Sequence, residues 1–296
     1  MEQKTRIKAH IGLCIVVCIW GFDYVPAKMG LDILSPMCLL FCKYIQGFAV
    51  MLIIKLVTKN GARVMLKDIP KFILCSLFGE ILYFNCEYNA MDYMPVSLIT
   101  ILLAFVPVFT VLIDWLVFKK KLRPAIIAGI FVCIAGVCLI IGVDIEEIIS
   151  GRLFGYLLCF GAILSWNVYN FLTSSLREYD SVTLTCTQMI CTMLLILPAV
   201  IHSFPSPDQF TPQIAAGLLW LGIIDAGLGF LMMVNGLKVL GPTISAVYSN
   251  FMPVTATFCS FVFLHETITP LQILGGIIVV ASGFFVIREN GKLTEM

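Results

Sequence analysis

Long apolar segments separated by short polar ones run along the whole chain. An α-helix needs about 20 mostly apolar residues to cross the hydrocarbon core of a membrane. Ten segments approach this length, and the connections between them are short. The pattern predicts an all-α membrane protein with ten transmembrane helices, at residues 10–29, 33–57, 70–91, 95–118, 124–142, 153–174, 182–203, 212–235, 242–264 and 270–288.

The second half of the chain repeats the plan of the first. Pro107, Pro124 and Gly129 have counterparts at Pro253, Pro270 and Gly275, each 146 residues later, and Trp20 and Trp166 share the same offset. Such a fixed period indicates an internal duplication. We therefore expect two five-helix repeats, at residues 1–148 and 149–296.

The basic residues predict how the helices are oriented. Cytoplasmic loops of membrane proteins are enriched in Lys and Arg. With the N-terminus inside, inner segments hold 16 of these residues and outer segments hold only Lys28 and Arg152. We therefore expect a multi-pass protein of the cell membrane with both termini cytoplasmic.

An odd number of helices in each repeat means that the second repeat enters the membrane from the opposite side. Two similar halves in opposite orientation form the inverted-repeat plan of many secondary transporters, in which the substrate binds near the midplane. The symmetry offers a route to alternating access, since one repeat can rock against the other.

Composition supports the membrane assignment and excludes several other classes. Hydrophobic residues make up 60% of the chain and charged residues 12%, whereas soluble domains are typically about 25% charged. The 12 cysteines lie mostly within apolar segments, where they act as small apolar residues. No basic patch interleaved with aromatic residues suggests a nucleic-acid partner.

Several motifs, in their order and spacing, resemble EamA-type transporters of the drug/metabolite transporter superfamily. They are Trp20-Gly21, Pro95-Val-Ser-Leu-Ile leading to Pro107-Val-Phe, Ser165-Trp166 with Tyr169, and Leu264-His-Glu-Thr-Ile-Thr. The resemblance covers essentially the whole chain. It implies ten helices, a central cavity, and export or exchange of small metabolites. One departure is that Glu266 keeps an acidic residue typical of the family, whereas Lys119–Lys121 stand at the matching place in the first half.

Ionisable side chains within the predicted spans are the first candidates for function. Each costs about 2.5–3.5 kcal/mol on insertion scales, so each needs a partner or a role. They are Asp23, Lys43, Glu80, Glu87, Asp114 and Asp225. Asp114 lies close to the predicted cytoplasmic end of its span, which favours a place in the membrane interface.

Glu80 and Glu87 stand seven residues apart, on one face of the predicted third helix. Tyr83 lies between them. Such a stripe can line a cavity and stack against a planar or amphipathic ligand. The alternative is that both carboxylates pair with neighbouring helices.

Asp23, Lys43 and Glu87 are expected at similar depths, which suggests a structural ion pair that involves Lys43. The spans hold five acids and one base, so the site favours a cationic or zwitterionic substrate. Burial without a partner favours the protonated form of a carboxyl group. Some of these acids are therefore candidates for proton exchange, Glu87 first and Glu80 second.

Aromatic and amide side chains complete the predicted substrate site. Trp166, Asn167 and Asn170 lie in the sixth helix, Asp225 in the eighth and Tyr248 in the ninth. A pocket needs a few placed polar groups among aromatic rings. We expect at least two of Trp20, Tyr83, Trp166 and Tyr248 to face the cavity.

The sequence favours a secondary transporter of a small organic metabolite, such as an amino acid or an amphipathic or cationic compound. No zincin motif, nucleotide-binding loop or dinucleotide fingerprint is present, and no cofactor or metal is expected. Two alternatives stay open at this point: a membrane-embedded enzyme that uses Glu80 and Glu87, and a channel.

Overall fold

The fold was analysed in a computed structural model, which describes residues 2–58, 63–116, 119, 123–141, 153–176, 178–240, 248 and 251–294. The first half holds α1 (Glu2–Leu31), α2 (Pro36–Thr58), η1 (Leu66–Asp68), α3 (Ile69–Cys75), η2 (Ser76–Leu82), α4 (Tyr83–Ala90), α5 (Val96–Leu103), α6 (Val106–Leu116) and α7 (Pro124–Ile141). The second half holds α9 (Leu153–Ser174), α10 (Ser181–Ile201), η4 (Pro207–Gln209), α11 (Pro212–Leu219), η5 (Trp220–Gly229), α12 (Phe230–Leu240), α14 (Met252–Phe263) and α15 (Pro270–Thr294).

Local sequence explains where several helices begin. Asp180 caps α10 by accepting a hydrogen bond from the backbone N–H of Thr183 at 2.9 Å. A capping box opens α15, since Thr269 and Gln272 each accept a hydrogen bond from the backbone N–H of the other. Because Pro107 has no N–H to donate, the fourth predicted span breaks into α5 and α6.

Within the described residues, seven helices are long and apolar enough to cross a membrane. Three shorter apolar helices lie at Pro124–Gly136, Met252–Phe263 and Pro270–Val286. Each of the ten predicted spans overlaps one of these helices. The chain is thus an all-helical, multi-pass membrane protein in the part that the structure describes, and the count of ten crossings stays a prediction.

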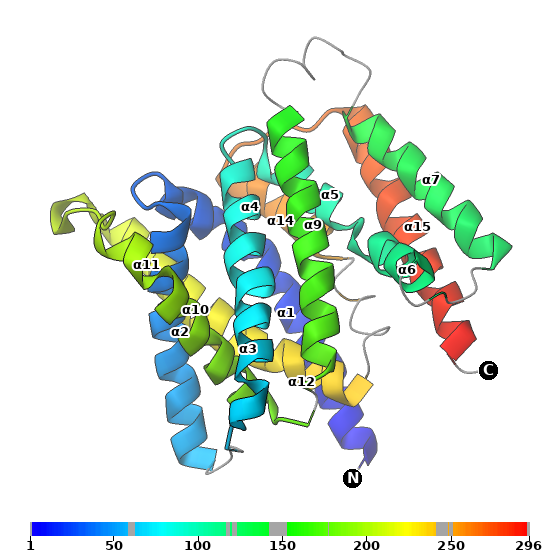
Figure 1. The fold of residues 1–296 in the computed structure, drawn as a ribbon. Helices are drawn as coiled ribbons and strands as arrows, with labels where there is room; N and C mark the ends of the chain where they lie inside the picture. Colours follow the sequence, from blue (N-terminus) through cyan, green and yellow to red (C-terminus); the bar gives the residue numbers. More distant parts are fainter. Residues whose placement is uncertain are drawn as a thin grey trace.

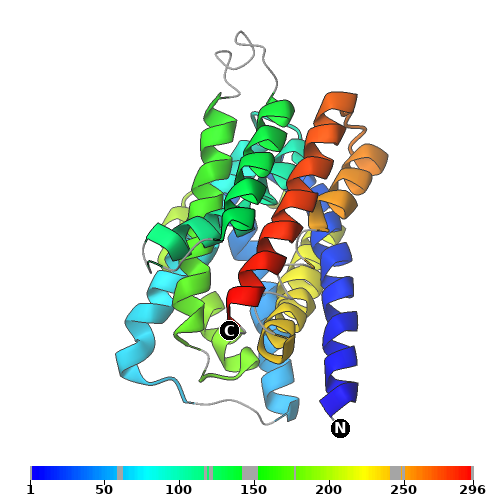
Figure 2. The same cartoon turned by 90° about the vertical axis from the view of Figure 1, so that its right-hand side faces the viewer.

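The helices pair in a pattern that relates the two halves. α2 packs on α10 and α7 on α15, so each of these two contacts joins counterparts from the two halves, and α5, from the fourth predicted span, packs on α14, from the ninth. α1 packs on η5 and α12, just as its counterpart α9 packs on η2 and α4. Exchange of the halves maps these contacts onto one another. α7 and α15 lie side by side at one flank of the bundle in both views (Figures 1 and 2).

The end of the bundle where α1 begins is called the lower end below, and the opposite end the upper end (Figure 1). α3, η2 and α4 form one continuous helical column that rises from the lower end, and α10 rises beside it. α11, η5 and α12 form the corresponding column of the second half, which descends to the lower end. These columns position the charged residues described next.

Candidate functional site

A buried ion pair joins the two halves in the interior of the bundle. Lys43, on α2, places its Nζ atom 2.5 Å from Oδ2 of Asp225, on η5, and each side chain is only 1% exposed. The ammonium group also lies 4.3 Å from the centre of the Phe84 ring, where the electron-rich face of the ring attracts a cation. The two halves therefore share a fully desolvated charge pair.

Two more carboxyl groups adjoin this pair. Asp23, on α1, lies near Asp225, Lys43 and Glu87 and interacts electrostatically with all three. Glu80, on η2, is 2% exposed and interacts with both Lys43 and Asp225. The Oε2 atom of Glu80 has no hydrogen-bond partner within the described residues. Coulomb interactions are strong in such a desolvated setting, so these carboxyl groups and Lys43 form one electrostatic unit.

Glu87, on α4, is held by two tyrosines. The hydroxyl groups of Tyr24 and Tyr83 donate to its Oε1 atom at 2.7 and 2.8 Å. Glu87 also interacts with Lys43 and Asp225. Asp23, Lys43, Glu80, Glu87 and Asp225 together are called the central cluster below.

The central cluster corrects one sequence-based expectation. Lys43 was expected to form its ion pair with the acids at a similar depth, Asp23 and Glu87, but its ion-pair partner is Asp225. The physical reason is that η5 of the second half packs directly on α2. Asp23 and Glu87 lie beside the pair, as their depth suggested.

Two π-helical segments place acids in the central cluster. Glu80 lies within η2 and Asp225 within η5, and η2 moved forward by the repeat offset falls inside η5. A π-helical turn holds an extra residue and is frequent at functional sites. It also changes the angular spacing of the residues around it, so the even stripe from Glu80 to Glu87 does not follow ideal α-helical geometry. Both carboxyl groups nevertheless reach the central cluster.

Aromatic rings border the central cluster on both halves. Trp166, on α9, lies with its ring centre 5.0 Å from the rings of Tyr83 and Tyr169. Its counterpart Trp20, on α1, lies 5.5 Å from the ring of Phe230. Gly79 permits the close approach of α9, because a Cβ atom there would stand 2.1 Å from the Tyr169 ring.

The other predicted site residues lie apart from the central cluster. Asn167 is buried and accepts a hydrogen bond from the hydroxyl group of Thr110 at 2.6 Å, whereas Asn170 is exposed. Tyr248 lies 2.8 Å from Nδ1 of His10, and His10 is about 20 Å from Asp23 along α1 at 1.5 Å per residue. The side chain of Asp114 lies outside the described residues, and so do Lys120 and Lys121.

Three side chains that shape the site were not among the predicted site residues, although Tyr169 is part of one of the motifs named above. Tyr24 donates to Glu87, Phe84 faces the Lys43 ammonium, and Tyr169 packs on Trp166. Tyr24 and Phe84 directly follow residues that were singled out, so their sequence neighbours offered a signal. Their roles depend on contacts between distant helices.

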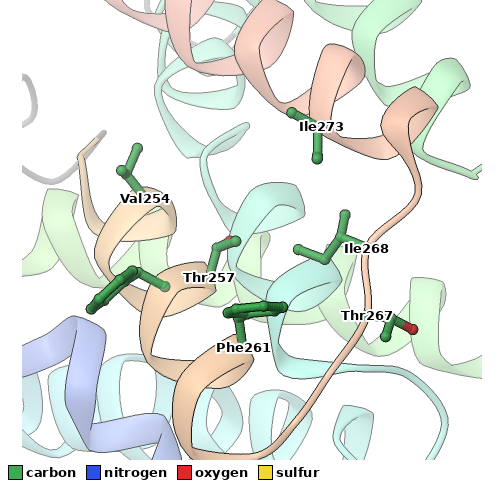
Figure 3. Close-up of a pocket in the computed structure, with 7 residues that line it drawn as sticks. Val254, Thr257, Phe261, Thr267, Ile268 and Ile273 are labelled. Atoms are coloured by element: carbon green, nitrogen blue, oxygen red, sulfur yellow. The ribbon is translucent and has the colours of Figure 1, made fainter.

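A surface hollow lies away from the central cluster, between α14 and the start of α15, with a volume of about 450 Å³. Val254, Thr257, Phe261, Thr267, Ile268 and Ile273 line it (Figure 3). A second hollow, of about 320 Å³, lies beside Cys14, Phe22 and Trp220. Both are apolar, as expected of a surface that faces lipid.

Comparison with known proteins places the chain among transporters. An "Uncharacterized transporter" of Archaeoglobus fulgidus is 27% identical over 93% of this chain and 95% of its own length. A "Probable terminal-alkyne amino-acid exporter" of Streptantibioticus cattleyicolor is 25% identical over 96% of this chain and 94% of its own length. A "Probable amino-acid metabolite efflux pump" of Salmonella typhimurium is 24% identical over 90% of both chains.

A solved crystal structure shares the fold, with a TM-score of 0.69 at 18% identity, over 95% of this chain and 97% of the other. The model of the EamA-like transporter family matches this chain twice, at residues 7–142 and 153–288. Together the two matches span most of the chain, one in each half. The chain therefore belongs to the EamA-like transporter family.

Proposed function

We propose that this chain is a secondary transporter that moves an amino acid, or another amphipathic or cationic metabolite, across the cytoplasmic membrane by alternating access. The observation that carries the proposal is the central cluster. It is charged and built from both halves, through Lys43 on α2 and Asp225 on η5, and four of its five side chains are buried. A site shared by two inverted repeats is where a transporter holds its substrate.

The charges of the central cluster suggest the class of substrate. Four carboxyl groups face one ammonium group, and Lys43 is already paired with Asp225. An anion entering this site meets excess negative charge, whereas an amine gains an attractive partner. The rings of Tyr83 and Trp166 offer an apolar surface for the rest of the molecule. The names of the Streptantibioticus and Salmonella relatives agree with an amino acid or its derivative.

The pairing of the helices suggests how the site changes sides. The contacts α2–α10 and α7–α15 each join counterparts from the two halves. A movement that opens one end of such an assembly has a symmetry-related movement that opens the other end. Transport is driven by exchange or by protons bound to the acids of the central cluster, since the chain has no nucleotide-binding loop.

The sequence left two alternatives to a carrier, an enzyme and a channel. The chain is a transporter and not an enzyme, because its family and its relatives are transporters. A channel remains the second candidate, since a channel also contains polar groups within a membrane. Kinetics separate a carrier from a channel.

Purified protein in liposomes tests the proposal. We expect saturable uptake of a radiolabelled amino acid or amine, and faster uptake when the vesicles are preloaded with the unlabelled compound. Asp225→Asn should abolish both signals, whereas Asp208→Asn, which changes an exposed acid on η4, should leave them unchanged. Linear, non-saturating flux without counterflow would show a channel and reject the proposal.

A further inference from the structure

Several buried polar groups on α10 have no hydrogen-bond partner. The side-chain atoms Thr183 Oγ1, Thr185 Oγ1, Gln188 Nε2 and Thr192 Oγ1 make no hydrogen bond with any described residue. The four side chains are between 0 and 2% exposed. Burial of a polar atom without a partner destabilises the fold, and four such atoms on a single helix require an explanation.

Three of these side chains share a face of α10. Thr185, Gln188 and Thr192 follow one another at i, i+3 and i+7, which aligns them on one side of a helix. They span about 10 Å at 1.5 Å per residue. Thr183, two residues before Thr185, lies on another side of α10. Thr185 is in the second turn, so the series starts near the lower end of the bundle.

This face of α10 lies against η2, the segment that carries Glu80. Ser76, on η2, donates its hydroxyl group to the carbonyl oxygen of Gln188 at 3.0 Å. α10 and the α3–η2–α4 column both rise from the lower end. One turn further along the two helices, Thr192 and Glu80 therefore reach a similar height. Glu80 Oε2 also has no partner among the described residues.

Tyr169 closes the series on the side of α9. Its hydroxyl group lies 3.4 Å from Oε1 of Gln188, and its phenol interacts with Glu80. The amide oxygen of Gln188 is thus engaged, whereas its Nε2 atom makes no hydrogen bond with any described residue. This donor and the acceptor Oε2 of Glu80 are both unpaired, and the hydroxyl groups of Thr185 and Thr192 lie on the same face of α10 as Gln188.

Water is the ligand that fits this chemistry. A buried water molecule needs two to four polar partners, and each hydroxyl, amide or carboxyl group here has capacity to spare. The steps between successive groups are about 4.5 to 6 Å along the axis, which one or two water molecules can bridge. A larger organic ligand does not fit among side chains this closely buried.

We propose that a file of water molecules lies between α10 and the α3–η2 segment, from Thr185 past Gln188 and Thr192 to Glu80, and carries protons between Glu80 and the lower end of the bundle. A proton moves along the file by transfer between neighbouring water molecules, and Glu80 alternates between carboxyl and carboxylate. The inference rests on the proposed function only in treating the central cluster as the transport site.

The charged and titratable groups around Glu80 come from several helices. They are Lys43 on α2, Asp225 on η5 and Tyr169 on α9. Since Lys43 and Asp225 are paired with each other, a proton on Glu80 changes the net charge of the central cluster.

The test follows the carboxyl group of Glu80 by infrared spectroscopy of the reconstituted protein. The carbonyl stretch that disappears in Glu80→Gln reports the protonated carboxyl group, and transfer to D₂O shifts this band as the proton exchanges. The variant with Thr185→Val, Gln188→Met and Thr192→Val should exchange several-fold more slowly. These changes keep side-chain size and remove only the polar atoms.

Thr187→Val is the matched control, because the hydroxyl group of Thr187 already donates to the carbonyl oxygen of Thr183 at 2.7 Å. It should exchange as fast as the parent protein. If the triple variant does not fold, Thr185→Val and Thr192→Val are measured singly, and each should slow exchange. Equal exchange in all variants, equal slowing by Thr187→Val, or the absence of a Glu80 carboxyl band at any pH overturns the proposal. Because no substrate is added, this result is independent of whether the proposed function holds.

Discussion

Lys119 and His265 stand 146 residues apart and both hold a left-handed backbone, with φ of 51° and 54°. Non-glycine residues seldom adopt this conformation, so its recurrence at the repeat offset indicates that the same tight turn ends the fourth helix of each half. The residue that follows differs: it is Glu266 in the second half and Lys120 in the first.

Glu266, in the second half, caps the start of α5, in the first half. Its Oε1 atom accepts a hydrogen bond from the N–H of Val96 at 2.9 Å, and its Oε2 atom accepts from the N–H and hydroxyl groups of Ser97 at 3.1 and 3.0 Å. The negative charge also suits the positive end of the α5 dipole. This contact joins the α14–α15 connection to the start of α5.

We predict that Glu266→Ala destabilises the protein by about 0.5–2 kcal/mol, the usual cost of a lost helix cap. Thermal unfolding of the purified protein in detergent measures the change. Glu178→Ala is the control, since Glu178 is an exposed acid. Equal thermal midpoints for the two variants would show that the cap contributes nothing.

The Lys43–Asp225 pair predicts a double-mutant result. Lys43→Met and Asp225→Leu each leave one buried charge without its ion-pair partner and should each destabilise the protein by about 3–5 kcal/mol. The double variant should recover much of that stability, because no unpaired charge of the pair remains. Denaturation of all four proteins gives the coupling energy, and additive effects would contradict a direct pair.

Glu87→Gln should fold normally, because Tyr24 and Tyr83 can still donate to the amide oxygen that replaces Oε1. If Glu87 exchanges protons or binds a cation, transport by this variant falls and no longer depends on pH. Uptake into liposomes across a series of pH values measures both effects. Transport like that of the parent at every pH would assign Glu87 a structural role.

Two glycines should respond differently to the same substitution. Gly79→Ala places a Cβ atom 2.1 Å from the buried Tyr169 ring, which cannot move without disturbing α9. We expect low yield of folded protein or loss of transport. Gly12→Ala meets its nearest neighbour, Met232, at an ordinary 3.7 Å and should be tolerated. Size-exclusion profiles and thermal midpoints compare the two, and tolerance of both would reject the tight contact.

Reporter fusions test the orientation and the inverted repeats. Green fluorescent protein at the C-terminus should fluoresce, as it does in the cytoplasm. Alkaline phosphatase joined after Asp208, between α10 and α11, should be active, as it is outside the cell. The opposite pattern would reverse the orientation inferred from the Lys and Arg residues. If the same reporter were active at both positions, both would lie on one side of the membrane, and the predicted number of crossings between them would be wrong.

The apolar pattern predicted the helices well because length and hydropathy are properties of local sequence. It did not indicate the break before Pro107, since the span at 95–118 is apolar throughout and was predicted as one helix. The apolar pattern could not predict the ion pair. Lys43 and Asp225 lie 182 residues apart, and no local pattern says that η5 packs on α2.

The π-helical segments were missed for a related reason. A helical wheel with 3.6 residues per turn assumes that the turn is uniform, and η2 and η5 are wider. Tyr248 shows the opposite limit: its residue type suits a substrate site, yet its place on the chain brings it to His10. Residue type indicates which chemistry is possible, and tertiary contacts select where it occurs.

The matched π-helical segments separate what the two repeats share from what each has alone. Both halves carry the widened turn at corresponding positions, although Glu80 corresponds to Ala226 and Asp225 to Gly79. A backbone feature shared by both repeats is most simply inherited from the single ancestral unit. The widened turn is thus common to both repeats, whereas each repeat places its carboxylate at its own position within that turn.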